Sequence, residues 1–238
     1  MAALTALDVR AFALGPLQTN AYLLRADSAA TEALIVDPGE ESERLLRALS
    51  DLGIARLAAI LITHCHFDHV GAVAPLARAT GAPVWCPAGE LAVLVELPRF
   101  APPGFGPFEG YKPEHTLSGG EELTLAGVRL EVLATPGHSP GHLTYAAYPA
   151  ATGDGAPAPA PAPVLFSGDV LFQGSVGRTD LPGADWSVLE RSLAELIDRF
   201  PPETVFYPGH MGASTLAREL ASNPFLAGIA AQRRTAGT

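Results

Sequence analysis

The feature that most constrains this chain is a dense group of histidine and aspartate residues directly after an apolar run. The group reads Thr63-His64-Cys65-His66-Phe67-Asp68-His69 and contains three of the seven histidines of the chain. The run before it, residues 57–62, predicts a buried β-strand. Imidazole and carboxylate groups are the usual protein ligands of zinc and similar cations. The sequence therefore predicts a loop that directs ligands at one or two metal ions, and a fold that brings further ligands to it.

The rest of the chain alternates short strands with amphipathic helices, which predicts an α/β fold. We predict strands at 7–14, 20–26, 33–36, 57–62, 83–86, 128–134, 143–148, 164–167 and 204–207, and helices at 41–52, 70–80, 90–97, 186–200 and 214–221. A hairpin is predicted over 122–132, with its turn at Ala126-Gly127. Residues 98–113 combine five prolines with four aromatic residues, and we expect either a connector or a lid over a site.

Length and composition predict one globular domain over residues 1–238. Of these 238 residues, 48% are hydrophobic and 17% are charged, which suits a protein with a substantial core and not a disordered chain. Residues 150–163 form a low-complexity run of alanine, proline and glycine. We interpret this run as an insertion into the domain and not as a domain boundary.

Charge and hydropathy exclude several kinds of partner. The formal net charge is −10, and the 15 lysines and arginines are scattered, so we expect no binding to nucleic acid. No apolar run approaches the roughly 18 residues of a membrane span, so we expect no membrane partner. The first ten residues do not resemble a signal peptide, and two lone cysteines fit a reducing compartment, which predicts a cytoplasmic protein. The expected partner is a small-molecule substrate, and the sequence predicts no particular oligomeric state.

Three more candidate ligands follow predicted strands elsewhere in the chain. His138, Asp169 and His210 each come after an apolar strand and a tight turn that contains glycine. Any one of them alone is explained as an ordinary turn residue. Strand ends, however, can bring distant residues to one edge of a sheet, and five of the seven histidines lie at such ends. We therefore predict that these residues join residues 64–69 in one pocket.

Four other polar residues are not predicted to bind a metal ion. Asp37 and Arg178 each have two possible roles, and His142 and His115 have one each. Asp37 lies in an Asp-Pro-Gly turn, where it either orients a ligand histidine or only shapes the turn. His142 is predicted to form hydrogen bonds next to the ligands, and His115 to lie on the surface. Arg178 either contacts an anionic substrate or pairs with Asp180, and we favour the pairing.

The cluster at residues 63–69, followed in order by His138, Asp169 and His210, resembles the metal-binding pattern of the metallo-β-lactamase superfamily over nearly the whole chain. Residues 166–172, 177–180 and 207–210 are similar to the glyoxalase II-like branch, also called hydroxyacylglutathione hydrolase-like. The resemblance implies a four-layer αββα sandwich with a dinuclear metal site at one edge of its two sheets.

The resemblance also implies a ligand set. By motif, the first ion would be held by His64, His66 and His138, and the second by Asp68, His69 and His210. Asp169 would bridge them, whereas many members that cleave β-lactams have cysteine at this place. The implied cofactor is a pair of divalent ions, zinc first, with iron or manganese as alternatives. Asp68 and Asp169 are the implied catalytic carboxylates.

The function that the resemblance implies is hydrolysis of an acyl thioester of a small thiol by a metal-bridging hydroxide. A thiol leaves as a thiolate with a pKa of roughly 8.5, so the reaction needs little proton donation. Two alternatives within the fold stay open. One is a persulfide dioxygenase with a single iron on His64, His138 and Asp169, and the other is a metal-binding module without catalysis.

A serine hydrolase is the alternative from a different chemistry. Residues 137–141 match the pattern G-x-S-x-G, with Asp169 and His210 following in the order of such enzymes. A nucleophile elbow lies between a strand and a helix, but residues 143–148 are predicted as a strand. That scheme also leaves residues 64–69 without a role, so we expect the match at Ser139 to be accidental.

Overall fold

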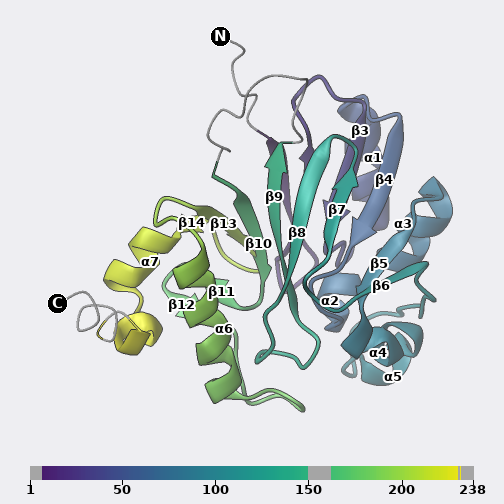
Figure 1. Ribbon diagram of the computed structural model, residues 1–238. Helices are drawn as coiled ribbons and strands as arrows, with labels where there is room; N and C mark the ends of the chain where they lie inside the picture. The colour runs from purple at the N-terminus through teal and green to yellow at the C-terminus, as the bar shows by residue number, and fades with distance from the viewer. Residues whose placement is uncertain (1–6, 150–161, 230, 232–238) are drawn as a thin grey trace, which may run out of the picture.

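The computed structural model describes residues 7–149, 162–229 and 231. Two six-stranded mixed sheets pack face to face, and helices cover the outer face of each sheet (Figure 1). This arrangement confirms the predicted four-layer αββα sandwich. The predicted insertion at 150–163 lies outside the described residues, apart from its last two positions.

The first sheet holds the strands of the N-terminal half in the order in which they occur. They are β1 (Asp8–Leu14), β2 (Thr19–Arg25), β3 (Glu32–Val36), β4 (Arg56–Leu61), β5 (Val84–Pro87) and β6 (His115–Leu117). The first three are antiparallel, and β3 to β6 run parallel. The outer face of this sheet is covered by α1 (Ser42–Asp51), α2 (Phe67–Val70), α3 (Val73–Thr80), α4 (Leu91–Val95) and α5 (Leu97–Phe100).

The second sheet is built from the C-terminal half. Its strand order is β14 (Ser214–Thr215), β13 (Val205–Pro208), β10 (Val164–Gly168), β9 (Leu143–Pro149), β8 (Val128–Ala134) and β7 (Glu122–Leu125). The parallel pair β10 and β13 is connected through α6 (Trp186–Arg199), which packs on the outer face with α7 (Leu216–Ser222). A separate hairpin, β11 (Leu171–Phe172) and β12 (Ser175–Val176), follows β10.

Three apolar layers hold the four structural layers together. In β4, Ile60 packs toward the helices and Leu61 packs toward the second sheet, and both are fully buried. This explains why residues 57–62 are continuously apolar, since a strand covered on both faces has no polar side. Tyr145 lies between the sheets, and Leu189 and Leu193 of α6 cover the second sheet. The strand that leads to the histidine cluster is therefore rigidly fixed.

The structure corrects several element predictions. The helix predicted at 70–80 begins three residues later, as α3, because Val70 is the last residue of α2 and Gly71 and Ala72 form a turn. A Cβ atom on Gly71 would lie 2.5 Å from the carbonyl oxygen of Gly39. The loop predicted at 98–113 is wrong in its first three residues, because α5 extends to Phe100 with buried Leu97 at its start. The helix predicted at 214–221 begins with the two residues of β14.

The remaining differences concern elements too short for a periodic pattern. They are β6, β11 and β12 and the 3-10 turns η1 (Ala88–Glu90) and η2 (Pro224–Leu226). Two or three residues are fewer than one period of a helix and leave no alternation to detect. None of the helices in the described part of the chain has the length and apolarity that a membrane-spanning helix needs.

Candidate metal centre

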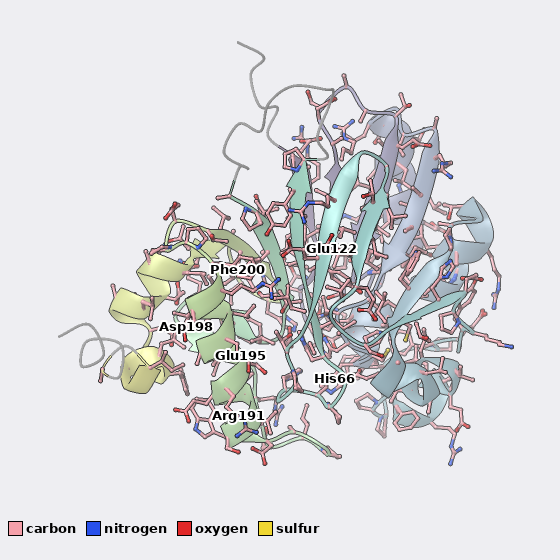
Figure 2. The ribbon with its side chains drawn as sticks, viewed as in Figure 1. His66, Glu122, Arg191, Glu195, Asp198 and Phe200 are labelled. Atoms are coloured by element: carbon pink, nitrogen blue, oxygen red, sulfur yellow. The ribbon has the colours of Figure 1, made fainter. Side chains whose placement is uncertain are left out.

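The predicted ligands come together at one edge of the sandwich. The cluster follows β4, His138 lies in the loop between β8 and β9, Asp169 follows β10, and His210 follows β13. Figure 2 shows His66 below the ends of β8 and β9, at the edge where these loops meet. The structure therefore brings the predicted ligands together at one edge, from loops that belong to both sheets.

Three ring nitrogens form the first group. His64 Nε2 lies 3.0 Å from His66 Nδ1, and His138 Nε2 lies 2.9 Å from the same atom. The outer nitrogens decide the tautomers. His138 Nδ1 donates to the carbonyl oxygen of Arg178 at 2.9 Å, so its Nε2 carries a lone pair in the neutral ring.

The tautomer of His64 follows from its neighbours in the same way. The Thr63 hydroxyl donates to Asp37 Oδ2 at 2.6 Å, and so it can only accept from His64 Nδ1, which lies 3.1 Å away. His64 Nε2 therefore also carries a lone pair. Lone pairs of His64 and His138 thus converge on His66, where a single proton satisfies only one of them.

The second group contains Asp68, His69 and His210. Asp68 Oδ2 lies 3.7 Å from His69 Nε2 and 3.4 Å from His210 Nε2. His69 Nδ1 donates to Asp37 Oδ2 at 3.0 Å, which leaves its Nε2 free to face Asp68. Asp37 therefore orients the candidate ligand His69 and does more than shape its turn.

Asp169 spans the two groups. Its Oδ1 atom lies 3.4 Å from His69 Nε2, and its Oδ2 atom lies 3.6 Å from both His138 Nε2 and His210 Nε2. Within the described residues, the buried atoms Asp169 Oδ1 and His69 Nε2 have no hydrogen-bond partner. Buried polar atoms are rarely left without partners, so this pair is suited to hold a cation.

The donor set fits divalent metal ions. The first group offers three imidazole nitrogens, and the second offers two imidazole nitrogens and a carboxylate oxygen. Within each group, these candidate ligand atoms lie within 4.8 Å of one another. Ligands at about 2.0–2.1 Å from a tetrahedral zinc ion would lie about 3.3 Å apart, close to the separations of 2.9 to 3.7 Å found here. The lone pairs of His64 and His138 face the same nitrogen of His66 and need a positive charge between them. A single proton on His66 can satisfy only one of these lone pairs.

Burial and the neighbouring charges shift the pKa values of these groups strongly. Burial and the nearby His138 and His69 lower the pKa of His66 to about 4. Burial alone would raise the pKa of Asp169, but His69, His210 and His138 together lower it to about 2. The same opposition holds the pKa of Asp68 below its usual value, with His69 as the main cause. Both carboxylates therefore stay ionised, as metal ligands must be.

Solvent reaches the centre past two of the ligands. His66 and His210 are partly exposed, whereas the other five predicted ligands are buried. The neighbouring Phe67 turns its ring toward the segment after α5, where Phe105 and Phe108 have ring centroids 4.7 and 5.9 Å from it. The aromatic residues of this irregular segment therefore pack on the helix that carries Asp68 and His69.

The supporting residues behave largely as predicted. His142 accepts a hydrogen bond from the Asp169 amide at 3.1 Å and stacks on His64, which confirms its place beside the ligands. Arg178 pairs with Asp180 through two contacts of 2.6 and 2.7 Å, as favoured from the sequence. His115 is exposed and stacks on the ring of Trp85.

Two residues at the centre were missed in the sequence. Thr19 is buried in β2 and donates to Asp68 Oδ2 at 2.7 Å. Glu90 is buried at the start of α4 and accepts hydrogen bonds from the loops that carry the ligands. Both contacts span 49 residues of sequence, and no local pattern distinguishes these residues from an ordinary strand threonine or helix glutamate.

The serine-hydrolase interpretation does not fit the geometry. Ser139 is buried and its hydroxyl donates to Glu90, and no histidine accepts from it among the described residues. The segment after it continues into strand β9 and not into a helix. A nucleophile elbow requires a histidine base in reach and an exposed hydroxyl, so the match is accidental.

Comparison with known proteins gives one family and several close relatives. Residues 14–147 match the model of the metallo-beta-lactamase superfamily. Hydroxyacylglutathione hydrolase GloC of Haemophilus influenzae is 34% identical to this chain, over 88% of this chain and 93% of that protein. Two crystal structures are similar throughout.

The first of these structures is the BLEG-1 B3 metallo-beta-lactamase, with a TM-score of 0.78 and 38% identity over 92% of this chain and 99% of that one. The second is TTHA1623 in a di-iron-bound form, with a TM-score of 0.72 and 39% identity over 92% and 100% of the two chains. Each of the two similarities therefore covers more than nine-tenths of this chain.

Proposed function

This chain belongs to the metallo-beta-lactamase superfamily, and we propose that it is a dinuclear metal-dependent hydrolase that cleaves an acyl thioester of a small thiol. The observation that carries the proposal is the position of Asp169, whose two oxygens face His69 on one side and His138 and His210 on the other. One carboxylate in contact with two ligand groups is the arrangement that a bridged pair of ions requires.

The residues of the chain divide into ligands and residues that orient them. His64, His66 and His138 would hold one ion, and Asp68, His69 and His210 the other. When bound, such ions supply a hydroxide nucleophile at neutral pH and polarise a carbonyl group.

Orientation comes from residues outside the ligand set. Asp37 fixes the ring of His69, and the Thr63 hydroxyl fixes the ring of His64. Thr19 holds Asp68 by a hydrogen bond of 2.7 Å. The ionised carboxylates Asp68 and Asp169 bring two negative charges to the centre, and with the outward hydrogen bonds they fix the ligand atoms before any substrate arrives.

Three observations support a thioester as the substrate. The relative from Haemophilus influenzae is named a hydroxyacylglutathione hydrolase. The position of the bridging ligand holds aspartate, where many members that cleave β-lactams have cysteine. A thiolate with a pKa of roughly 8.5 leaves without protonation, which suits a centre where both carboxylates are ionised. Glutathione or another small thiol would complete the substrate.

The irregular segment after α5 is our candidate for substrate contact. Phe105 and Phe108 pack on Phe67, which lies between the ligands His66 and Asp68. Shortening the tip of this segment should change KM more than metal content. A loss of metal without a change in KM would make the segment a structural connector.

Two other members of the superfamily remain as alternatives. A persulfide dioxygenase would use one iron on His64, His138 and Asp169, and the second ligand group at Asp68 speaks against it. A metal-binding module without catalysis would need no access to the centre, yet two ligands are partly exposed. The di-iron form of a similar structure leaves zinc, iron and manganese as candidate metals.

The test combines metal analysis with a small panel of substrates. We expect about two divalent ions per chain, hydrolysis of a hydroxyacyl thioester of glutathione, and no oxygen uptake on a persulfide. A β-lactam serves as the comparison substrate, because one similar structure carries the name of a β-lactamase. Protein without zinc, iron or manganese above background would overturn the proposal, and one iron with oxygen uptake would replace it by the dioxygenase.

A further inference from the structure

Glu90 is a buried carboxylate outside the ligand set. It is 4% exposed at the start of α4, and no cationic side chain pairs with it among the described residues. Burying a carboxylate is costly unless hydrogen bonds replace those it makes with water. Glu90 therefore needs strong donors, and the structure supplies three.

The three donors come from two different ligand loops. The Cys65 amide donates to Glu90 Oε2 at 2.5 Å, and the Ser139 hydroxyl and the Gly141 amide, the latter at 3.2 Å, donate to Oε1. Cys65 lies between the ligands His64 and His66, and Ser139 follows the ligand His138. One carboxylate thus connects both loops that supply the first ligand group.

The close approach of these segments depends on two glycines. A Cβ atom on Gly89 would lie 3.1 Å from Gly141 Cα, and one on Gly141 would lie 2.7 Å from Glu90 Cγ. The segment Gly137-His138-Ser139-Pro140-Gly141 therefore has a physical explanation. Its serine supplies a hydroxyl to the carboxylate, and its second glycine makes room for the carboxylate to reach the loop.

We propose that Glu90 is a positioning residue that fixes the distance between the loop of His64 and His66 and the loop of His138, so that their three nitrogens converge on one ion. The inference rests on the metal centre of the proposed function and adds a residue to it. Glu90 touches no candidate ligand atom. Its effect on the ion passes through the Cys65 amide and the Ser139 hydroxyl.

A second buried carboxylate provides a matched control. Glu219 is 1% exposed and accepts hydrogen bonds from the Gly174 amide, the Ser214 hydroxyl and the Asn223 side chain. It is similar to Glu90 in burial and has the same number of donors, but its donors lie in β14, in the hairpin of β11 and β12, and directly after α7. Substitution of Glu219 therefore measures how much stability is lost when a buried carboxylate of this kind is removed. Glu219 does not connect the loops of the first ligand group, so this loss is separate from any effect on metal binding.

The experiment is a zinc competition titration of the full-length protein against a chelator. Glu90→Gln should weaken the binding of one of the two ions by about 10- to 100-fold, the usual effect of losing a residue that orients ligands. Glu219→Gln should lower the melting temperature of the metal-free protein about as much as Glu90→Gln does. It should leave the affinity for that ion within about threefold of the value for the unmodified protein. In Glu90→Gln, NMR of the imidazole nitrogens should show weaker metal binding at His66 and His138 and unchanged metal binding at His210.

Ser139→Ala keeps the test decisive if Glu90→Gln does not fold. Ser139→Ala removes one of the three donors, so it should lower the affinity for the same ion by about threefold or more. The proposal is overturned if Ser139→Ala leaves the affinity for that ion unchanged. It is also overturned if Glu90→Gln and Glu219→Gln change the affinities for the two ions to the same extent. If the unmodified protein binds none of zinc, iron or manganese, the proposed function itself has failed, and this outcome is distinct from two tightly bound ions whose affinities do not respond to Glu90→Gln.

Discussion

Asp169 Oδ1 and His69 Nε2 lie 3.4 Å apart, and neither buried atom has a hydrogen-bond partner among the described residues. Asp37 accepts a hydrogen bond from His69 Nδ1, so His69 Nε2 faces the carboxylate. This nitrogen carries a proton in the metal-free protein, where the neighbouring carboxylates raise the pKa of His69, and a lone pair when a metal ion replaces that proton. Two acceptors face each other in a buried site only if a proton or a metal ion lies between them. This relationship suits a metal ion that replaces the proton, and the residues around it give four predictions before the direct test of Asp169.

Gly209→Ala should disrupt the centre. A Cβ atom at this position would lie 2.1 Å from Asp169 Oδ1 and 2.5 Å from His69 Cε1, so the carboxylate or the ring must move. We expect zinc affinity to fall by a factor on the order of ten or more. Gly212→Ala is the control, since its Cβ atom would meet only the end of the Gln173 side chain at 3.1 Å. Equal zinc content in both variants and the unmodified protein would contradict the geometry described here.

Asp37→Asn should weaken metal binding without removing a ligand. Asp37 accepts hydrogen bonds from the Thr63 amide, the Thr63 hydroxyl and His69 Nδ1, and an amide group places a donor against one of them. The expected loss in zinc affinity is about 10- to 100-fold, measured by competition with a chelator. Asp27→Asn, in an exposed turn, serves as the control. Unchanged affinity in Asp37→Asn would show that the ring of His69 needs no such support.

Ser139→Ala should keep its catalytic rate when zinc is saturating. Its hydroxyl is buried, donates to the Glu90 carboxylate and reaches no histidine among the described residues, so we expect it to have no part in the chemical step. We expect kcat within a few-fold of the unmodified enzyme, although a weaker ion makes activity fall at limiting zinc. A loss of about 10³-fold or more at saturating zinc would restore the serine-hydrolase interpretation.

The metal-free protein should be most stable near pH 6.5. Burial lowers the pKa values of His64, His66 and His142, so between about pH 4 and pH 6.5 the unfolded chain binds more protons and stability falls as the pH falls. The pKa values of His69 and His210 are raised by their carboxylate neighbours against the effect of burial. For these two the folded state binds more protons above pH 6.5, so stability falls as the pH rises.

Thermal unfolding of chelator-treated protein between pH 4.5 and pH 8.5 checks this prediction. Saturating zinc should remove the decline at high pH, because the ligands must lose their protons to bind the ion. A melting temperature that rises steadily to pH 8.5 without metal would mean that His69 is not held in its charged form by Asp169 and Asp68.

The convergence of the candidate ligands could be predicted because each of them follows a strand that local patterns reveal. Residues 57–62 are buried on both faces, so their apolar run is unambiguous, and the cluster after it is dense in ligand types. The paired sheets then place the ends of β4, β10 and β13 at one edge. The four-layer fold was predicted from the resemblance, since periodicity alone indicates only an α/β chain.

The residues that orient the ligands could not be predicted in the same way. Thr19 and Glu90 act through contacts that span 49 residues each, and the position of their partners depends on how the sheets pack. The break between α2 and α3 depends on the approach of Gly71 to the Gly39 carbonyl. Such contacts arise from tertiary structure, and a pattern of neighbours along the chain contains no trace of them.

The most direct test of the central claim is the metal content of Asp169→Ala. Asp169 is the only candidate ligand among the described residues whose two oxygens face both groups, so its removal should weaken both ions together. Metal analysis after dialysis should find about two ions per chain in the unmodified protein and well below one in the variant, with hydrolysis lost in parallel. If Asp169→Ala loses one ion and keeps the other at full occupancy, Asp169 is not the bridge, and the proposed dinuclear centre is wrong.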